Sequence, residues 1–308
     1  MKYLLFPLPK IKEEYTARHG SITADKKPKN DFLTERDFTF SFLFSFFSGT
    51  IRANTFTKKM IPEKKLQEFC DAFLQVQQVP DPWCENGLQV PGKGNIQRIA
   101  LGTSASKNFL EQAANWNADA VIVHHGLFWK NGVKKINPIL AERLRIVMKN
   151  NISLFAYHLP LDAHPEIGNN AQIAKKLHLK NIHMVDICVV GEMEQEMNFE
   201  DFEKKCAEIF GQKVNFSNTF FGNTVRKIGI CSGGGASYAQ LLNEEGIDTF
   251  LTGEMSENHY HDFREMGINV VACGHHATER FGVQALGEVL QKEFPETEIL
   301  FFHEECPV

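Results

Sequence analysis

The stretch AVIVHHG, residues 120–126, sets the interpretation of this chain. Its apolar part predicts a buried strand, Ala120–His124, and two adjacent imidazoles, His124 and His125, follow at its end. Imidazoles that lose hydration at the edge of a sheet cost free energy unless a bound partner compensates for the lost water. Because neighbouring strand residues point to opposite faces, both can bind one ligand only if the chain turns, which Gly126 permits. The alternative is one core histidine bonded to the backbone and one surface histidine.

Three more side chains that can bind metal ions follow other predicted elements. Asp162 lies in AYHLPLDAHPEIGNN (156–170), and His275 and Glu279 lie in ACGHHATERFG (272–282). If a helix opens at residues 277–280, His275 and Glu279 share one face and can converge on one ion. The simpler interpretations are a turn-forming aspartate and a glutamate at the positive end of a helix. With His124 and His125, these residues form a set of three histidines and two carboxylates that suits one or two divalent transition metals.

From Met60 onward, short apolar strands alternate with amphipathic helices. The predicted strands span residues 96–104, 120–124, 152–157, 184–190, 225–232, 248–252, 269–273 and 298–302; the helices between them include 107–116, 139–149, 169–177, 199–210, 256–266 and 278–294. This alternation predicts an α/β fold with mainly parallel sheets, and the number of strands predicts two α/β lobes. We place a metal-ligand lobe at residues 60–185 plus 265–308 and a second α/β lobe at 186–264. Ligands of such folds bind beyond the carboxyl ends of strands, which is where these residues fall: His124, His125, Asp162, Thr252–Glu254 and His275.

Composition excludes several classes of protein. The chain has 308 residues, 43% of them apolar and 23% charged, and no run approaches the roughly 18 apolar residues that span a bilayer. Seven cysteines without a CxxC pair exclude zinc-finger and iron–sulfur spacing and favour free thiols, so we expect a cytoplasmic protein. Residues 60–308 hold 22 basic and 32 acidic side chains, and this acidic balance argues against nucleic-acid binding.

Residues 1–59 differ from the rest of the chain. They hold 11 basic and 6 acidic side chains and a Phe-rich segment, FTFSFLFSFFSGTI (38–51). That segment sits too far from the start, after acidic residues, to be a secretory signal. We expect residues 1–59 to be a poorly ordered extension and Met60 to begin the functional chain. The intact mass of the untagged native protein tests this expectation.

Two further segments carry candidate supporting residues. CSGGGAS (231–237) joins a strand to a helix, and its backbone amides would either hold an anion or serve only in a packing turn. TGEMSENHYH (252–261) contains Glu254, a candidate general base after a strand, and His261, a candidate for orienting substrate.

Five blocks of sequence resemble the signature blocks of the NIF-three-like proteins, also called GTP cyclohydrolase I type 2 homologues. They are WCENGLQV (83–90), AVIVHHGLF (120–128), AYHLPLDAHPEIGNNAQIAKKL (156–177), FLTGEMSE (250–257) and GHHATERFGVQAL (274–286). Their order and distances are similar to the short bacterial YbgI-like branch of that family, and the resemblance runs from Met60 to the C-terminus. The N-terminal extension has no counterpart in the family pattern. The span from Cys188 to Asn198 leaves no room for the inserted domain of longer members.

The resemblance implies two interlocked α/β lobes, a dinuclear metal site in the cleft between them, and a toroidal homohexamer. It implies two divalent ions per subunit (Fe, Mn, Zn or Ni) and these five ligands: His124, His125, Asp162, His275 and Glu279. Three residues match family positions near the site, and we take them as tentative catalytic residues: His158, Glu254 and His261.

The expected function is that of a metal-dependent hydrolase, a GTP cyclohydrolase I type 2 homologue, in which metal-activated water attacks a nucleotide or a related heterocycle. Two alternatives stay open at this point. One is a metal-dependent phosphoester hydrolase, which the same ligand set would serve. The other is a non-catalytic metal-binding protein or ring scaffold.

Overall fold

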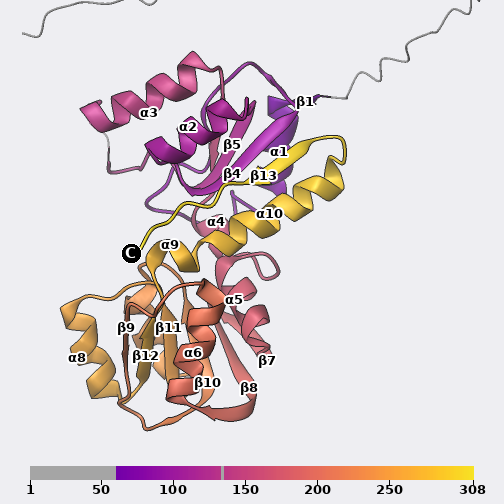
Figure 1. The fold of residues 1–308 in the computed structure, drawn as a ribbon. Helices are drawn as coiled ribbons and strands as arrows, with labels where there is room; N and C mark the ends of the chain where they lie inside the picture. The colour runs from indigo at the N-terminus through magenta and orange to yellow at the C-terminus, as the bar shows by residue number, and fades with distance from the viewer. Residues whose placement is uncertain (1–59, 133–134) are drawn as a thin grey trace, which may run out of the picture. The chain divides into compact units, whose positions relative to one another are not determined.

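The computed structural model describes residues 60–132 and 135–308, which build an α/β fold on two main sheets (Figure 1). The α/β class predicted from the sequence is therefore confirmed. The predicted N-terminal extension, residues 1–59, lies outside the described residues. Within the described part of the chain, no helix has the length and apolar character needed to cross a membrane.

The first main sheet has five strands in the order β13-β4-β5-β6-β2. They are β2 (Gly87–Val90), β4 (Arg98–Ser104), β5 (Ala120–His125), β6 (Ser153–Ala156) and β13 (Glu298–Phe301). All neighbours are parallel except β2 and β6, so the prediction of a mainly parallel sheet is confirmed here. A short antiparallel pair, β1 (Ile61–Pro62) and β3 (Asn95–Ile96), forms a separate sheet.

Residues of the five-stranded sheet alternate between two apolar cores, as the period of a strand requires. Ile122 of β5 packs in the core with α1 (Glu63–Phe73) and α10 (Arg280–Glu293). Its neighbours Val121 and Val123 pack in the opposite core with α2 (Lys107–Asn115) and α3 (Pro138–Lys149). Both faces are covered, which explains why β5 is apolar at every position before its histidines.

The second main sheet has six strands in the order β7-β8-β10-β11-β12-β9. They are β7 (Lys180–Val185), β8 (Cys188–Asn198), β9 (Phe216–Asn218), β10 (Thr224–Cys231), β11 (Thr249–Thr252) and β12 (Asn269–Ala272). Only β10, β11 and β12 run parallel, so the prediction of a mainly parallel sheet is wrong for this one. Asp186, with φ 56°, turns the chain between β7 and β8, which the apolar pattern merges into one strand.

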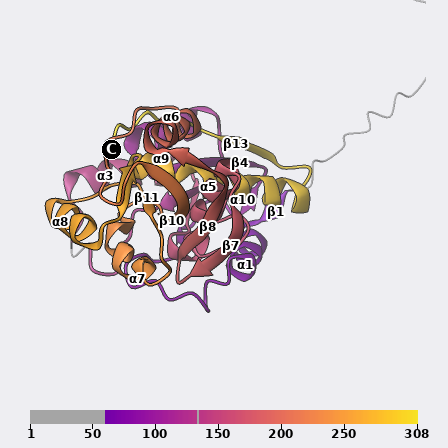
Figure 2. The ribbon, with the colours of Figure 1, turned by 90° about the horizontal axis from the view of Figure 1, so that it is seen from below.

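Helices cover both faces of the six-stranded sheet. On one face lie α5 (Asn169–Leu177) and α6 (Phe199–Phe210); on the other lie the 3-10 turn η1 (Gly235–Tyr238), α7 (Ala239–Asn243) and α8 (Glu257–Met266) (Figure 2). The lobe boundaries predicted from the sequence need correction. They assign β7 and β12 to the metal-ligand lobe, whereas both strands belong to the six-stranded sheet. β7 is held there by its hairpin and β12 by its parallel pairing with β11.

The helices α10 and α5 connect the two sheets. α10 packs against β4, β5 and β13 and also against α5. Its residues Val283 and Leu286 lie in the core of the five-stranded sheet, and Phe281 lies in the core shared with α5 and α6. The helix α10 also contacts the segments on which the predicted ligands lie, at residues 120–125, 159–162 and 275–278, and so helps to hold them together.

Candidate metal centre

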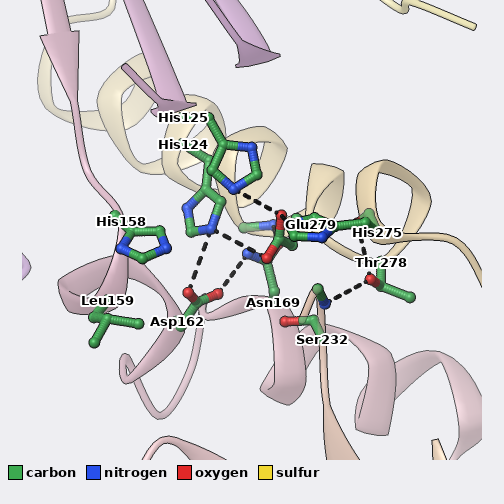
Figure 3. Close-up of polar contacts among 12 residues, drawn as sticks. His124, His125, His158, Leu159, Asp162, Asn169, Ser232, His275, Thr278 and Glu279 are labelled. Carbon is green, nitrogen blue, oxygen red and sulfur yellow. Dashed lines mark hydrogen bonds and ion pairs between the residues drawn. The ribbon is translucent and has the colours of Figure 1, made fainter. Parts of the chain in front are cut away.

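The predicted ligands come from four places in the fold. His124 and His125 end β5, and Asp162 ends the short helix α4 (Leu159–Asp162). His275 begins α9 (His275–Thr278), and Glu279 forms the junction between α9 and α10, with φ −108° and ψ 8°. The predicted helix over 278–294 therefore starts two residues late, because Glu279 leaves the helical conformation. Figure 3 shows these side chains pointing toward one another.

Among the described residues, two overlapping groups contain all five predicted ligands. One group is His124, Asp162 and Glu279, and the other is His125, His275 and Glu279; within each, the ligand atoms lie within 4.8 Å of one another. Glu279 is common to both. Its Oε1 lies 3.6 Å from His124 Nε2, and its Oε2 lies 3.0 Å from Nε2 of His125 and of His275. Each oxygen of this carboxylate therefore faces a different group.

Polar contacts behind the cluster orient His124, His125 and Asp162. The Nδ1 of His124 lies 2.9 Å from the carbonyl oxygen of Tyr157, which can only accept a hydrogen bond. In the neutral ring the proton is therefore on Nδ1, and the lone pair of Nε2 faces the cluster. The Nδ1 of His125 lies 3.1 Å from Ser104 Oγ, and Asp162 Oδ1 accepts a 2.7 Å hydrogen bond from Asn169 Nδ2.

The cluster has the features of a place for cations. The Nε2 of His124 and the Oε2 of Glu279 are fully buried and make no hydrogen bond with good geometry, although opposite charges lie within ion-pair distance. Buried polar atoms are nearly always hydrogen-bonded, so atoms left in this way call for another partner. Three imidazoles and two carboxylates are donors that divalent transition metals accept. The residues present therefore fit the implied metal ions.

The electrostatics of the cluster agree with this interpretation. Burial alone would lower the pKa of His124, but the carboxylates of Asp162 and Glu279 outweigh it and raise that pKa to about 9. Burial likewise opposes the charge on His275, and Glu279 and Glu254 raise its pKa to about 9. Without a metal, positively charged imidazoles neutralise the carboxylates; a divalent cation would take over that role.

Gly233 in the CSGGGAS turn makes room for Glu279. Its φ is +58°, and a Cβ atom there would lie 1.9 Å from Glu279 Oε1. Two amides of the turn are engaged: Ser232 N donates to Asn170 Oδ1 at 2.7 Å, and Gly233 N donates to Thr278 Oγ1 at 2.9 Å. Of the two interpretations of this turn, close packing against the cluster is the one that the contacts favour.

His158 lies beside the cluster, in a group with His124 and His125. Its Nδ1 is 3.0 Å from Oδ2 of Asp81, a buried carboxylate that was not among the predicted site residues. Asp81 Oδ1 also accepts from the backbone amides of Trp83 and Cys84, both at 3.0 Å. Asp81 lies in a Pro-rich loop, where an aspartate has the appearance of a turn former, so no local signal in the sequence marks it.

The other two tentative catalytic residues differ in their positions. Glu254 Oε1 lies 3.2 Å from Nδ1 of His275, so this largely exposed carboxylate contacts the outer nitrogen of a predicted ligand. His261 lies on α8, and its Nε2 is 3.0 Å from Oε1 of Glu257, one turn earlier. Among the described residues, those lining the cavities at the cluster do not include His261. The structure thus brings Glu254 to the site and leaves His261 on the surface of α8.

A cavity of about 340 Å³ opens onto the cluster. Predicted ligands and His158 form one part of its lining, and the glycine turn forms another. The remaining wall is mostly apolar and aromatic, with one polar residue, Asn170, beside Trp83, Trp129, Leu159, Ile187 and Tyr238. The cluster is therefore accessible to a small molecule.

The fold and site define an α/β protein with a histidine–carboxylate cluster of the metal-binding kind. The family model Duf34/NIF3 (NGG1p interacting factor 3) matches residues 63–307, and the chain belongs to this family. A GTP cyclohydrolase 1 type 2 homolog of Haemophilus influenzae is 42% identical over 235 residues, which cover 75% of this chain and 93% of the relative. The corresponding Escherichia coli protein is 40% identical over 211 residues, covering 68% and 85%.

Solved structures agree with this assignment. The protein ybgI, described as of unknown function, is 35% identical with a TM-score of 0.77, covering 80% of this chain and 100% of its own. A protein of Thermus thermophilus is 30% identical with a TM-score of 0.73, at the same coverage. The resemblance predicted from the sequence blocks, including its YbgI-like branch, is confirmed.

Proposed function

We propose that this protein is a hydrolase that depends on a pair of divalent metal ions. The observation that carries the proposal is the position of Glu279, whose two oxygens face two different groups of ligand atoms. His124 and Asp162 would complete one ion's protein ligands, and His125 and His275 the other's. Fe, Mn, Zn and Ni all suit such mixed imidazole–carboxylate donors.

The ions, when bound, would make hydroxide available near neutral pH and stabilise negative charge that develops on the substrate. The chain's own residues set the conditions for that chemistry. Asp81 Oδ2 lies 3.0 Å from the Nδ1 of His158 and would hold a proton there, so that in the neutral ring the Nε2 of His158 is the acceptor for a proton at the cavity wall. Glu254 orients His275 from outside the cluster. Burial of Asp162 and Glu279 excludes bulk water from the floor.

A nucleotide or a related heterocycle is the substrate class that we propose, in line with the relatives named GTP cyclohydrolase 1 type 2 homolog. A phosphoester hydrolase is the first alternative. A non-catalytic metal-binding or ring scaffold protein is the second, and the cavity beside the cluster speaks against it, since a storage site needs no room for a substrate. The toroidal homohexamer and the cytoplasmic location stay predictions.

Metal content per subunit tests the proposal. The purified protein is stripped, reloaded with Mn, Fe, Zn or Ni, and analysed by plasma mass spectrometry. We expect about two ions per subunit, and at most about one in His125→Ala and in Glu279→Gln. His183→Ala is the matched control, because His183 also pairs with a glutamate but lies exposed on β7. Equal metal content in all four proteins would refute the proposal.

Turnover is measured separately. The metal-loaded protein is incubated with a cellular metabolite extract, and consumed compounds are identified by mass spectrometry with the His125→Ala variant as the blank. We expect at least one heterocyclic compound to disappear only with the unchanged protein. If no compound is consumed with any of the four metals, the non-catalytic alternative takes its place.

A further inference from the structure

We infer that the cavity selects an uncharged, planar heterocycle by stacking on Trp83 and Trp129, and that it rejects the same ring carrying a polyphosphate. The inference rests on the proposed function, since it names the substrate class for that same metal centre. It narrows the substrate from nucleotides in general to free bases, nucleosides and similar rings.

The first support is the pair of indoles at the cavity. Trp83 is 49% exposed although it is one of the largest apolar side chains, and Trp129 is partly buried. Both line the cavity together with the predicted ligands. Their rings stand almost at right angles to the ring of His158, at centroid distances of 6.3 Å for Trp83 and 5.2 Å for Trp129. Indole faces beside a metal site offer a platform for a flat ligand.

The second support is that the backbone holds these indoles in place. Cys84 and Trp129 form an isolated antiparallel bridge, and Lys130 N donates a 2.7 Å hydrogen bond to the carbonyl oxygen of Trp83. The Trp83 amide is in turn bound to Asp81 Oδ1. The two loops are thus joined beside the cavity. Groups fixed in advance lose little freedom when a ligand binds, which favours recognition by stacking.

The rest of the wall is also without charge. Burial raises the pKa of Tyr238 to about 12, so its phenol stays neutral and can serve as a hydrogen-bond donor. Leu159 and Ile187 add apolar surface. A flat ring with polar atoms on its edge would find apolar contacts along its faces and the metal centre at its edge.

The third support is the charge of the lining. Within the described residues, no lysine or arginine lines this cavity, whereas the carboxylates of Asp162 and Glu279 do. Two basic side chains that are sequence neighbours of lining residues, Lys130 and Arg280, bind backbone carbonyl groups instead. Lys130 Nζ donates to the carbonyl oxygen of Asp81 at 2.6 Å, and Arg280 Nη2 donates to that of Phe210 at 2.8 Å. Proteins that bind polyphosphates surround them with Arg, Lys or free backbone amides.

At the glycine turn, the amides of Ser232 and Gly233 already donate to Asn170 and Thr278, so these two are not free for a phosphate. The metal ions would therefore be the main positive charges available to a ligand, and they would lie at the floor among two carboxylates. A triphosphate that reached them would bring several negative charges into a cavity whose described lining holds no lysine or arginine.

Calorimetric titration tests this inference. The zinc-loaded full-length protein is titrated with guanosine, adenosine, cytidine and uridine, and with the triphosphate of each, so that every pair shares one ring. We expect at least one nucleoside to bind about tenfold more tightly than its triphosphate, with an affinity that changes little between about 50 and about 300 mM salt. Trp83→Ala should weaken that nucleoside about tenfold and leave the zinc content unchanged.

Trp116→Ala is the matched control, because Trp116 packs against Phe302 and Arg98 and does not line this cavity. Its nucleoside affinity should equal that of the unchanged protein. A triphosphate that binds more tightly than its nucleoside, with an affinity that falls steeply with salt, overturns the inference. So does a Trp83→Ala variant with unchanged affinity, or a failure of all four nucleosides to bind while zinc is retained. Failure of the unchanged protein to hold zinc overturns the proposed function itself.

Discussion

Replacing Gly233 by alanine is expected to weaken metal binding strongly at a modest cost in stability. Gly233 has φ +58°, and an added Cβ would lie 1.9 Å from Glu279 Oε1 and 3.1 Å from His275 Nε2. Real Cβ atoms essentially never come within 3.0 Å of such a neighbour, so Glu279 or the turn must move by about 1 Å. Metal–ligand distances tolerate only about 0.2 Å. The displacement is therefore several times larger than a bound ion would accept.

The cost in stability has a separate origin. A left-handed conformation costs an alanine roughly 1–2 kcal/mol relative to glycine. Gly246 provides the matched control, because its φ is +68° and no atom lies within 4 Å of an added Cβ. Gly246→Ala should therefore carry the backbone cost without the collision.

The assay compares the two variants in the same two measurements. Urea unfolding of the metal-free proteins should show a loss of roughly 1–2 kcal/mol for Gly246→Ala and at least as large a loss for Gly233→Ala, which adds the collision with Glu279. Zinc titration should show an affinity at least about tenfold weaker for Gly233→Ala and unchanged for Gly246→Ala. If Gly233→Ala binds zinc as tightly as Gly246→Ala, the assigned role of Glu279 is refuted.

Three further predictions follow from the same contacts. Zinc binding at pH 7.5 should release about two protons, because carboxylates raise the pKa of His124 and of His275 to about 9 in the metal-free state. Calorimetric titration in buffers of different ionisation enthalpy measures the number of protons released, and release of none would contradict the prediction. For the same reason, the two charged rings stabilise the metal-free protein below about pH 6.5, and this contribution is lost as the pH rises through about 9. The urea midpoint of the metal-free protein should therefore fall over that range, and that of the zinc-loaded protein should not. Burial would raise the pKa of Asp81, but hydrogen bonds from His158 and others bring that pKa below the ordinary value, so Asp81 stabilises the fold above about pH 4 and loses this effect on acidification. In urea unfolding, Asp81→Asn should therefore be less stable than the unchanged protein at pH 7 and closer to it at pH 3. An equal difference in stability at both pH values would refute this.

The clustering of the three histidines and two carboxylates was predictable from the sequence because each member has a local signal. His124 and His125 end an apolar run, and the four-residue spacing of His275 and Glu279 places their side chains 3.0 Å apart even though the helix breaks at Glu279. Asp162 alone has only a weak signal, since an aspartate in such a loop usually forms a turn, and it became a candidate ligand only together with the other four residues. The α/β class followed in the same way, from the alternation of apolar strands and amphipathic helices.

Other features depend on contacts between distant segments and left no local pattern. The hairpin of β7 and β8 was missed because β8 carries charged residues along its exposed half. The direction of a strand cannot be told from its apolar pattern alone, so the mixed six-stranded sheet was not foreseen. Asp81 acquires its role through His158, which lies 77 residues away in sequence. The sequence shows that His261 can bind or transfer a proton, but it does not show where the side chain lies. In the structure His261 pairs with Glu257, one turn away on α8.

Anomalous X-ray diffraction from zinc-loaded crystals measures the central claim most directly. We predict two peaks about 3.5–4 Å apart, with Glu279 between them. One peak should contact His124 and Asp162, and the other His125 and His275. Well-diffracting, zinc-saturated crystals with no anomalous peak at these five side chains would contradict the account.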